Sequence, residues 1–225
     1  RLALADHVQE RLVGLKPAHM PFLFPEVFLR ERSGFDVLIG NPPWEEVKVD
    51  DWRWWTLRFP GVMGMKAKDR ERFIEELHAT RPDLVVDLES ERTACDTLRH
   101  ALTKGPYPGI GTGDIDLYKA FAWRNWDLLR LGGRVGLVLP RSALVARGTT
   151  EWREAVIARG SFDDVCFLEN KGGWVFPEVS AITMALTVIS REEGGLVTYC
   201  GPFHTYTDYL EGRHNRGKAT TEEFS

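Results

Sequence analysis

The residues Asn41-Pro42-Pro43-Trp44 combine hydrogen-bond acceptors with a flat aromatic ring, directly after a short apolar run. That run, Phe35–Gly40, predicts a buried parallel strand because it is apolar and contains β-branched residues. Neither proline can donate a ladder hydrogen bond, so the backbone must leave the sheet as a rigid turn. The turn places an amide oxygen, backbone carbonyls and an indole at the carboxyl edge of the strand, where open α/β sheets bind ligands. Such groups suit an enzyme that holds an exocyclic amino group for attack.

Strands and helices alternate along the rest of the chain, which predicts an α/β domain with a largely parallel sheet. After the glycine-rich loop 104–113, a helix opening at Asp114 is expected to present Leu117, Phe121 and Leu128 on one face. It should end at a left-handed cap formed by Gly132-Gly133. The remaining predicted elements are helices over 68–78, 82–102 and 150–160, and strands over 135–140, 164–168 and 182–189.

The run FDVLIGNPPW resembles the catalytic motif of the amino-methyltransferases, which is Asn/Asp/Ser-Pro-Pro followed by Tyr, Phe or Trp. Enzymes of this family transfer a methyl group from S-adenosylmethionine to a planar nitrogen, most often the N6 of adenine in DNA. The asparagine at Asn41 resembles the adenine version more than the cytosine version, which usually begins with serine. The tryptophan at Trp44 is the rarer choice of aromatic.

Two later segments resemble the same family in the same order. GDIDLYKAF…LLRLGGRVGLVLP is similar to the Asn-Leu-Tyr helix, Gly-Gly turn and strand of adenine DNA methyltransferases of the gamma motif order, with Asp116 in place of the usual asparagine. The segment 173–182 resembles the one whose aromatic residue stacks on the flipped-out adenine, and Phe176 is the matching position. The resemblance covers about residues 22–190.

The resemblance implies an incomplete, Rossmann-like methyltransferase sheet, mostly parallel, with helices on both faces. Residues 1–34 would lead into the catalytic strand. Residues 35–190 would form the catalytic part, with a helical insertion at about 66–103, and residues 191–225 would lead toward an absent recognition region. The implied activity is methylation of adenine N6 in double-stranded DNA, within a larger restriction–modification or phage-defence protein.

The resemblance also assigns roles to residues. Asn41, Pro42, Pro43 and Trp44 would be catalytic, and Asn41 and Pro42 would also contact the cofactor. The Asn41 side-chain oxygen and the Pro42 carbonyl would each accept one hydrogen of the amino group, while Trp44 and Phe176 would stack on the two faces of the extruded base. No metal site is implied.

The main loop for S-adenosylmethionine should lie upstream of the catalytic motif, and nothing in residues 1–34 fits it. The only glycine cluster, Gly109 to Gly113, has no apolar strand in front of it, whereas dinucleotide and phosphate loops require strand, loop and helix in sequence. We therefore expect the chain, which begins at Arg1, to be a segment that lacks the amino-terminal half of the methyltransferase sheet.

The composition is that of an ordinary globular protein, with 43% hydrophobic and 28% charged residues in 225. No apolar stretch is long enough to cross a bilayer, and the start does not resemble a signal peptide. Neither the three cysteines nor the six histidines show metal-ligand spacing, so a reducing, cytoplasmic setting is expected. The net charge of −4 argues against a dedicated nucleic-acid coating protein, but local clusters could contact phosphates: Lys66 to Arg72, and Arg134, Arg141, Arg147, Arg153 and Arg159.

The same residues also fit other functions. Asn-Pro-Pro-aromatic motifs also occur in methyltransferases of RNA adenine and of protein glutamine, and a non-catalytic DNA-binding or assembly domain could retain the fold. The aromatic run Trp52 to Trp55 is interpreted as packing into a missing part of the protein, with a lid or a DNA wedge as alternatives.

Overall fold

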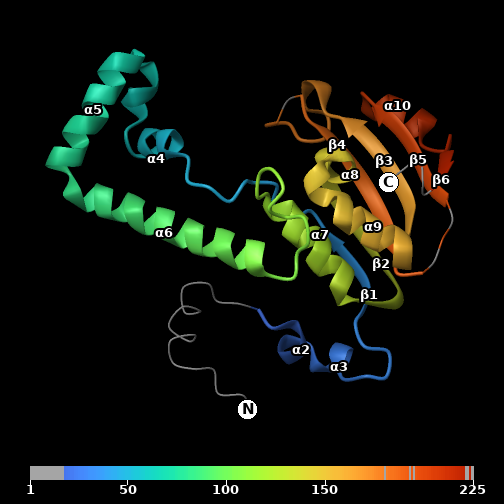
Figure 1. Ribbon diagram of the computed structural model, residues 1–225. Helices are drawn as coiled ribbons and strands as arrows, with labels where there is room; N and C mark the ends of the chain where they lie inside the picture. The colour runs from blue at the N-terminus through green and yellow to red at the C-terminus, as the bar shows by residue number, and fades with distance from the viewer. Residues whose placement is uncertain (1–17, 180, 193, 195, 221–222, 224–225) are drawn as a thin grey trace. The chain divides into compact units, whose positions relative to one another are not determined.

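The computed structural model describes residues 18–179, 181–192, 194, 196–220 and 223. The chain forms two compact units, and each is described by itself. The sheet unit comprises Arg1–Glu46 and Pro106–Ser225, and the helical unit comprises Val47–Gly105. In the sheet unit the described α-helices are α2 (Met20–Leu23), α3 (Pro25–Phe28), α7 (Leu117–Leu128), α8 (Ser142–Val145), α9 (Thr150–Arg159) and α10 (Tyr206–Gly212) (Figure 1). Its short 3-10 helices are η2 (Arg147–Thr149) and η3 (Lys171–Gly173).

A six-stranded open sheet forms the centre of the sheet unit, in the order β1-β2-β4-β3-β5-β6. Its strands are β1 (Phe35–Gly40), β2 (Leu129–Pro140), β3 (Ser161–Glu169), β4 (Thr183–Ser190), β5 (Leu196–Phe203) and β6 (Gly217–Thr220). The pairs β1·β2 and β3·β5 are parallel, whereas β2·β4, β3·β4 and β5·β6 are antiparallel.

The expectation of a mostly parallel sheet is therefore only partly correct, because the sheet is mixed. The cause lies in the connection between β3 and β4, residues 170–182, whose described part contains only the short helix η3. A parallel pairing needs a crossover that carries the chain back along the sheet, usually through a helix. Without one, β4 returns antiparallel and inserts between β2 and β3.

The strand β2 begins earlier than the sequence pattern indicated. Helix α7 ends at Leu128, and the chain enters β2 at once, so the expected helix cap at Gly132-Gly133 is wrong. Gly132 does have a left-handed backbone, with φ of 73°, but within the strand. The register between β1 and β2 shifts between Phe35 and Val37, so these glycines lie in an irregular part of the ladder.

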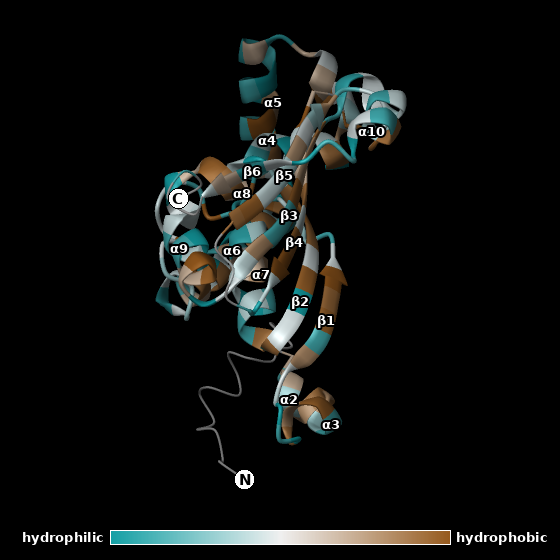
Figure 2. Cartoon of the chain, turned by 90° about the vertical axis from the view of Figure 1, so that its right-hand side faces the viewer, coloured by the Kyte–Doolittle hydropathy of each residue, from teal (hydrophilic) through white to brown (hydrophobic). Residues whose placement is uncertain are grey.

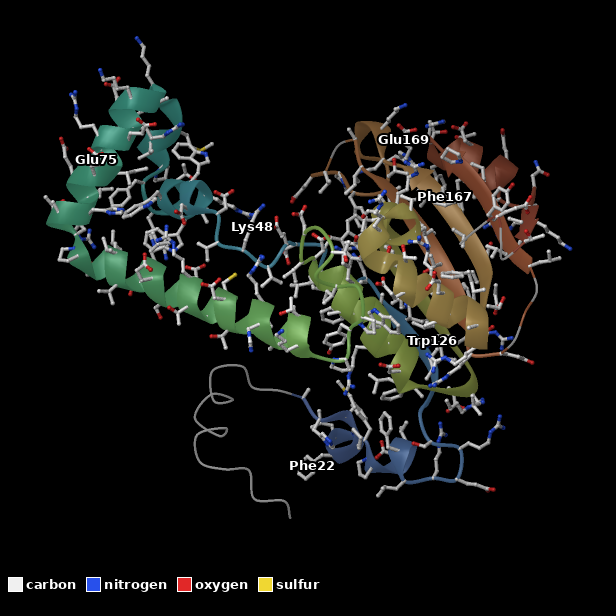
Figure 3. All side chains as sticks on the ribbon, in the orientation of Figure 1. Phe22, Lys48, Glu75, Trp126, Phe167 and Glu169 are labelled. Atoms are coloured by element: carbon white, nitrogen blue, oxygen red, sulfur yellow. The ribbon has the colours of Figure 1, made fainter. Side chains whose placement is uncertain are left out.

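The helices α7, α8 and α9 cover one face of the sheet and form the main core (Figure 1, Figure 2). Trp126 of α7 and Trp152 of α9 are each 1% exposed there, and they pack with alternate residues of β2, β3 and β4. Figure 3 labels Trp126 on α7. The predicted apolar face of this helix is partly wrong, since Phe121 is 43% exposed and the buried side instead carries Tyr118, Ala122 and Trp126.

The opposite face of the sheet is only partly covered. Near β3 and β5, the buried side chains of Cys166, Cys200 and Phe203 pack under Tyr209 of α10. On β1, by contrast, Val37 is 61% exposed and Ile39 is 87% exposed. The prediction of a buried parallel strand over Phe35–Gly40 is therefore correct in the pairing, which is parallel to β2, and wrong in the burial, because β1 is the outer strand of the described sheet. Figure 2 shows α10 on the side of the sheet opposite to α7 and α9.

The helical unit is built from α4 (Asp51–Arg58), the 3-10 helix η1 (Pro60–Gly64), α5 (Ala67–Thr80) and α6 (Pro82–Lys104). Trp54 and Trp55 are 4% and 2% exposed, and their core partners include Leu77 and Leu88. The Trp54 indole also donates to the Glu91 carboxylate at 2.6 Å. Both tryptophans therefore pack inside this unit, which corrects the expectation that they pack into a missing part of the protein and leaves neither free to act as a wedge.

Among the described helices, none has both the length and the apolar character that a membrane span requires.

The close approach of β1 and β2 at Gly133 leaves no room for a side chain. A Cβ there would lie 2.7 Å from the Phe35 carbonyl oxygen and 3.0 Å from that of Arg130. We expect Gly133→Ala to lower the free energy of unfolding by about 1–3 kcal/mol, because backbone atoms must move apart. Urea denaturation measures the change. Gly64→Ala is the control, since its added Cβ meets nothing within 4 Å, and equal stability losses in the two variants would contradict this account.

An ion-pair cluster at the start of β1 predicts a pH effect. Arg130 and Arg30 donate hydrogen bonds to the two carboxylate oxygens of Asp36, and they lower the pKa of that carboxyl to about 2. A lowered pKa in the folded state gives stability that is present above the usual pKa near 4 and is lost as the pH falls toward 2. Asp36→Asn should therefore melt below the unaltered protein at pH 7, with the difference in Tm shrinking toward pH 2. A Tm difference that is constant with pH would contradict this assignment.

Candidate functional site

The turn Asn41 to Trp44 lies where the chain leaves β1 at the carboxyl end of the strand, as the sequence pattern predicted. Asn41 is exposed and Pro42 is buried. The proline thus packs into the protein, while the asparagine is accessible from outside. These four residues line an open pocket of about 430 Å³ together with Phe176, Val179 and Ile182. We call this the edge pocket. The fold thus brings together the sequence-predicted residues of the catalytic motif and the predicted aromatic of a distant segment.

Trp44 forms a wall of the edge pocket whose orientation is set by a hydrogen bond. Its indole Nε1 donates to the carbonyl oxygen of Val138 on β2 at 3.2 Å. The half-buried ring also packs against both hydrophobic cores of the sheet unit. A ring held by one directional bond and by packing has little freedom to rotate.

Phe176 supplies a second aromatic wall at right angles to the first. The centroids of the Trp44 and Phe176 rings lie 6.3 Å apart, and the ring planes meet at 88°. Edge-to-face packing of this kind is favourable between aromatic rings. It also means that a planar ligand can stack on one of the two rings in this arrangement, and that stacking on both requires one ring to turn.

The segment that carries Phe176 is organised around a residue that the motif analysis missed. Asn170 directly follows β3 and is 0% exposed. Its Nδ2 donates to the carbonyl oxygens of Phe176, at 2.9 Å, and of Val179, while its Oδ1 accepts from the backbone N–H of Val175 at 2.9 Å. The sequence offers no distinctive signal for Asn170, since a single asparagine after a strand forms no motif.

Backbone hydrogen bonds close the base of the same segment. The N–H of Asn170 donates to the Ile182 carbonyl at 2.8 Å, and the N–H of Ala181 donates to the Asn170 carbonyl at 3.1 Å. The indole of Trp174 donates to the carbonyl of Glu169 at 2.9 Å. Figure 3 labels Glu169 and Phe167, which mark the end of β3 from which this segment starts.

The second family-like segment lies beside the first. An isolated β-bridge joins Glu46 and Asp116, and the Leu117 N–H at the start of α7 donates to the Glu45 carbonyl at 3.0 Å. Burial raises the pKa of the Asp116 carboxyl, and the ammonium group of Lys119, 3.4 Å away, opposes that shift. The start of α7 therefore supports the chain just beyond Trp44.

The glycine cluster Gly109 to Gly113 serves a structural role. Ile110 is 2% exposed, and the Lys119 ammonium donates to the Asp114 carbonyl and, at 3.5 Å, to that of Thr112. Between α6 and α7 the described chain contains no strand, which confirms the expectation that none precedes this loop. The loop directs carbonyls toward a buried lysine, whereas a phosphate-binding loop directs backbone N–H groups toward an anion.

A second pocket adjoins the first on the partly covered face of the sheet. It measures about 500 Å³, and its lining includes Ile39, Asn41 and Val138 together with Asp164 and Arg216. We call it the sheet pocket. Arg216 forms an ion pair with Asp164 at 2.9 Å. Asn41 lines both pockets, so its amide lies at their boundary.

The arginines proposed to contact phosphates fall into two groups. Arg153 is 5% exposed and donates to the Ala146 carbonyl at 3.0 Å, so it is buried in the protein and does not reach a phosphate at the surface. Arg134 pairs with Asp163 at 3.3 Å. Arg141 and Arg147 are exposed, and both follow the carboxyl end of β2, the same edge of the sheet as Asn41.

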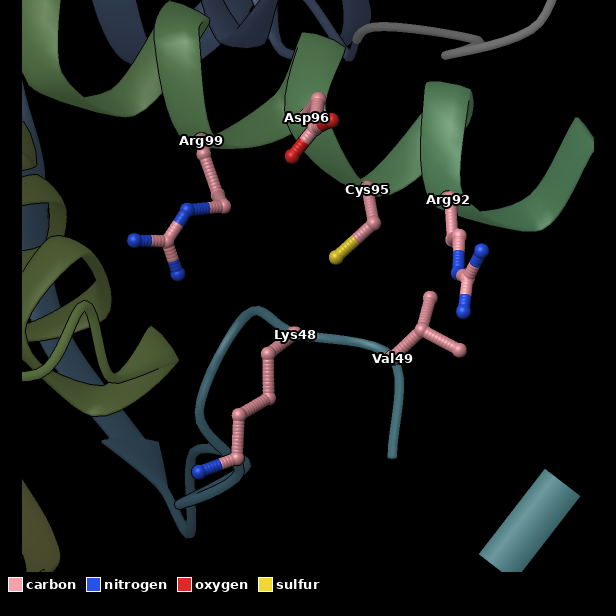
Figure 4. A pocket seen from close by; sticks show the side chains of 6 residues that line it. All are labelled: Lys48, Val49, Arg92, Cys95, Asp96 and Arg99. Carbon is pink, nitrogen blue, oxygen red and sulfur yellow. The ribbon is translucent and has the colours of Figure 1, made fainter. Parts of the chain in front are cut away.

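The helical unit has a smaller pocket of about 280 Å³, which lies between α6 and the segment before α4 (Figure 4). Its cations already have partners: Arg92 pairs with Asp51 and Glu89, and Arg99 donates to the Val47 carbonyl at 2.8 Å. Its lining lacks a stacking ring. The edge pocket is therefore the stronger candidate for chemistry.

Comparisons with known proteins add the following findings. No protein-family model and no curated protein matches this chain. Among solved structures, a modification subunit assigned to a type I restriction enzyme of Vibrio vulnificus YJ016 is 14% identical with a TM-score of 0.48, over 84% of this chain and 34% of that one. The type IIG restriction endonuclease BpuSI is 15% identical with a TM-score of 0.45, over 84% and 19%. The type I methyltransferase subunit of Streptococcus thermophilus is 16% identical with a TM-score of 0.39, over 55% and 31%.

This chain thus spans about a third of the length of the Vibrio vulnificus subunit.

Proposed function

We propose that this chain is part of an S-adenosylmethionine-dependent methyltransferase that acts on the N6 amino group of adenine in DNA, within a larger restriction–modification or phage-defence protein. The observation that carries the proposal is the edge pocket, in which the Asn41 to Trp44 turn meets Phe176. Two segments that resemble the family separately, and lie far apart in sequence, line the same pocket. A degenerate assembly domain would have no reason to keep an exposed amide beside two aromatic walls.

In this proposal Asn41 and Pro42 raise the reactivity of the amino group. The nitrogen lone pair of adenine N6 is delocalised into the purine ring, so the nitrogen is a poor nucleophile. The Asn41 side-chain oxygen would accept one amino hydrogen and the Pro42 carbonyl the other, which favours a pyramidal nitrogen with a localised lone pair. Acceptors held in place before the reaction stabilise the developing charge without reorganisation. The two prolines supply that rigidity.

The aromatic walls would hold the base outside the duplex. Stacking on an aromatic side chain is worth ~1–3 kcal/mol per base and helps to offset the loss of base stacking in the DNA. Trp44, which is fixed by its bond to Val138, is the stationary surface. The Phe176 ring packs edge-to-face with the Trp44 ring in this structure, and it would turn to cover the opposite face of the base.

The residues present fit one side of a cofactor site. Asn41 lines the sheet pocket as well as the edge pocket, so a methyl donor in the first and an amino group in the second would meet at this residue. S-adenosylmethionine supplies a methyl group on a positively charged sulfur. Its main binding loop is assigned, in this proposal, to the amino-terminal half of the parent sheet.

Duplex DNA would be held by cations along the same edge of the sheet. Arg141 and Arg147 are exposed beyond the carboxyl end of β2 and are available to phosphates. Phosphate contacts of this kind position a duplex without reading its sequence. Sequence recognition is therefore assigned to a separate region of the parent protein.

Asn41→Ala should lower methyl transfer by about 10²- to 10³-fold, the usual effect of removing one preorganised polar contact to a transition state. The assay uses the longest native chain that contains this segment, with labelled S-adenosylmethionine and unmethylated DNA. The product is digested to nucleosides and identified by mass, with N6-methyladenine expected. Asn215→Ala, which alters an exposed asparagine outside the edge pocket, is the matched control.

Full activity in Asn41→Ala would reject the mechanism. N4-methylcytosine as the product would retain the chemistry and reject the base assignment. The absence of any methylated base would reject the proposed function in favour of an RNA or protein acceptor, or of a non-catalytic domain.

Variants of Trp44 separate stacking from anchoring. Trp44→Phe keeps an aromatic face but leaves the Val138 carbonyl unpaired, so a loss of about 1–3 kcal/mol in stability with most activity retained is expected. Trp44→Ala should also lower kcat/KM for DNA by about 5- to 150-fold, the equivalent of one stacked base. Thermal melts and DNA-dependent kinetics on both variants test this. If Trp44→Phe and Trp44→Ala lowered kcat/KM by the same factor, stacking on the aromatic face would be rejected.

A further inference from the structure

The segment between β3 and β4 presents Phe176 to the edge pocket, although beyond the short helix η3 its described part has no regular secondary structure to hold it. Such a segment must satisfy its backbone polar groups in some other way. Here one buried side chain does so. The amide of Asn170 lies inside the segment and contacts its backbone at Val175, Phe176 and Val179.

The hydrogen bonds use the full capacity of that amide. Its two N–H donors go to the carbonyl oxygens of Phe176 and Val179. Its oxygen accepts from the N–H groups of Val175 at 2.9 Å and Phe176 at 3.3 Å. An asparagine amide has two donors and an oxygen with two lone pairs. Phe176 is therefore bonded on both its N–H and its carbonyl, so its backbone is held from two sides.

Asn170 acts at a distance from any ligand. It is 0% exposed and is not part of the lining of the edge pocket, so it cannot touch a substrate there. Its influence can reach the pocket only through the residues that it holds, and Phe176 is the one with a ring against Trp44. A buried amide is costly unless it is fully bonded, so its presence here implies a specific demand on the segment's shape.

We propose that Asn170 is the positioning residue for Phe176, fixing the backbone from which the second aromatic wall of the edge pocket projects. This rests on the proposed function only for its catalytic consequence. Each aromatic wall is then held by hydrogen bonds to one polar group. The Val138 carbonyl accepts from the Trp44 indole, and the Asn170 amide bonds the backbone of Phe176. No residue of similar size replaces the anchor, because aspartate would place oxygen against the carbonyls of Phe176 and Val179.

The first test measures the segment itself by hydrogen exchange with mass spectrometry in the longest native chain. In Asn170→Ala the N–H groups of Val175 and Phe176 lose their acceptor, so exchange in a peptide over 171–182 should accelerate at least about tenfold. Peptides from β2 and β3 should exchange as before. Asn170→Asp should also accelerate exchange over 171–182, because its second oxygen faces the carbonyl oxygens of Phe176 and Val179 and cannot donate to them. Asn215→Ala is expected to change nothing.

The second test asks whether Asn170 acts through Phe176. Asn170→Ala should lower kcat/KM for methyl transfer to unmethylated DNA by about 10- to 100-fold, the scale of a misplaced contact. Phe176→Ala should cause a similar loss. In the double variant the loss should be close to that of Phe176→Ala alone, because the anchor has nothing left to position.

The outcomes are distinct. Unchanged exchange over 171–182 in Asn170→Ala overturns the proposal, as does acceleration spread equally over the sheet, which would mark a purely structural residue. Additive kinetic losses in the double variant also overturn it. If no acceptor is methylated by the unaltered protein, the proposed function fails, whereas local acceleration over 171–182 would still support Asn170 as the residue that positions Phe176.

Discussion

The parallel pairing of β1 with β2 is the interaction on which the candidate site depends. The register places Gly40 opposite Leu137, so the turn at Asn41 emerges beside the last residues of β2. Val138 then lies where its carbonyl can accept from Trp44. Proline at two successive positions makes the exit from β1 abrupt, and a shift of the ladder by one residue would turn every side chain of β1 to the other face. The ring of Trp44, and with it the edge pocket, follows from this register.

Sequence patterns predicted the elements that have a local cause. The strand before Asn41, the helices near 67–80 and 82–104, and the strands that became β3 and β4 are recognisable from apolar periodicity and from turn residues. The pairing of strands was not accessible in the same way. The antiparallel insertion of β4 depends on a connection whose described part contains no crossover helix. Gly132 looked like a helix cap because a left-handed glycine occurs both at helix caps and in irregular strands.

The candidate site was predictable to a similar degree. The motif at Asn41 has a distinctive composition, and Phe176 was found because its segment resembles a known one. Asn170 was missed because a lone asparagine after a strand has no pattern of its own, and its importance comes from the carbonyl and N–H groups that the fold brings around it. Trp54 and Trp55 show the same limit: the sequence suggested that they pack into a missing part of the protein, whereas the helices of their own unit enclose them.

The exposed side of β1 has a practical consequence. β1 is the outermost strand of the described sheet, and Val37 and Ile39 project from it into solvent. An outer strand with apolar side chains is a template onto which a strand of another molecule can add, the first step of aggregation. Protein chemists who prepare this 225-residue chain by itself should expect its solubility to be limited at β1, and a charged side chain at Val37, which lies outside the sheet pocket, is the simplest remedy.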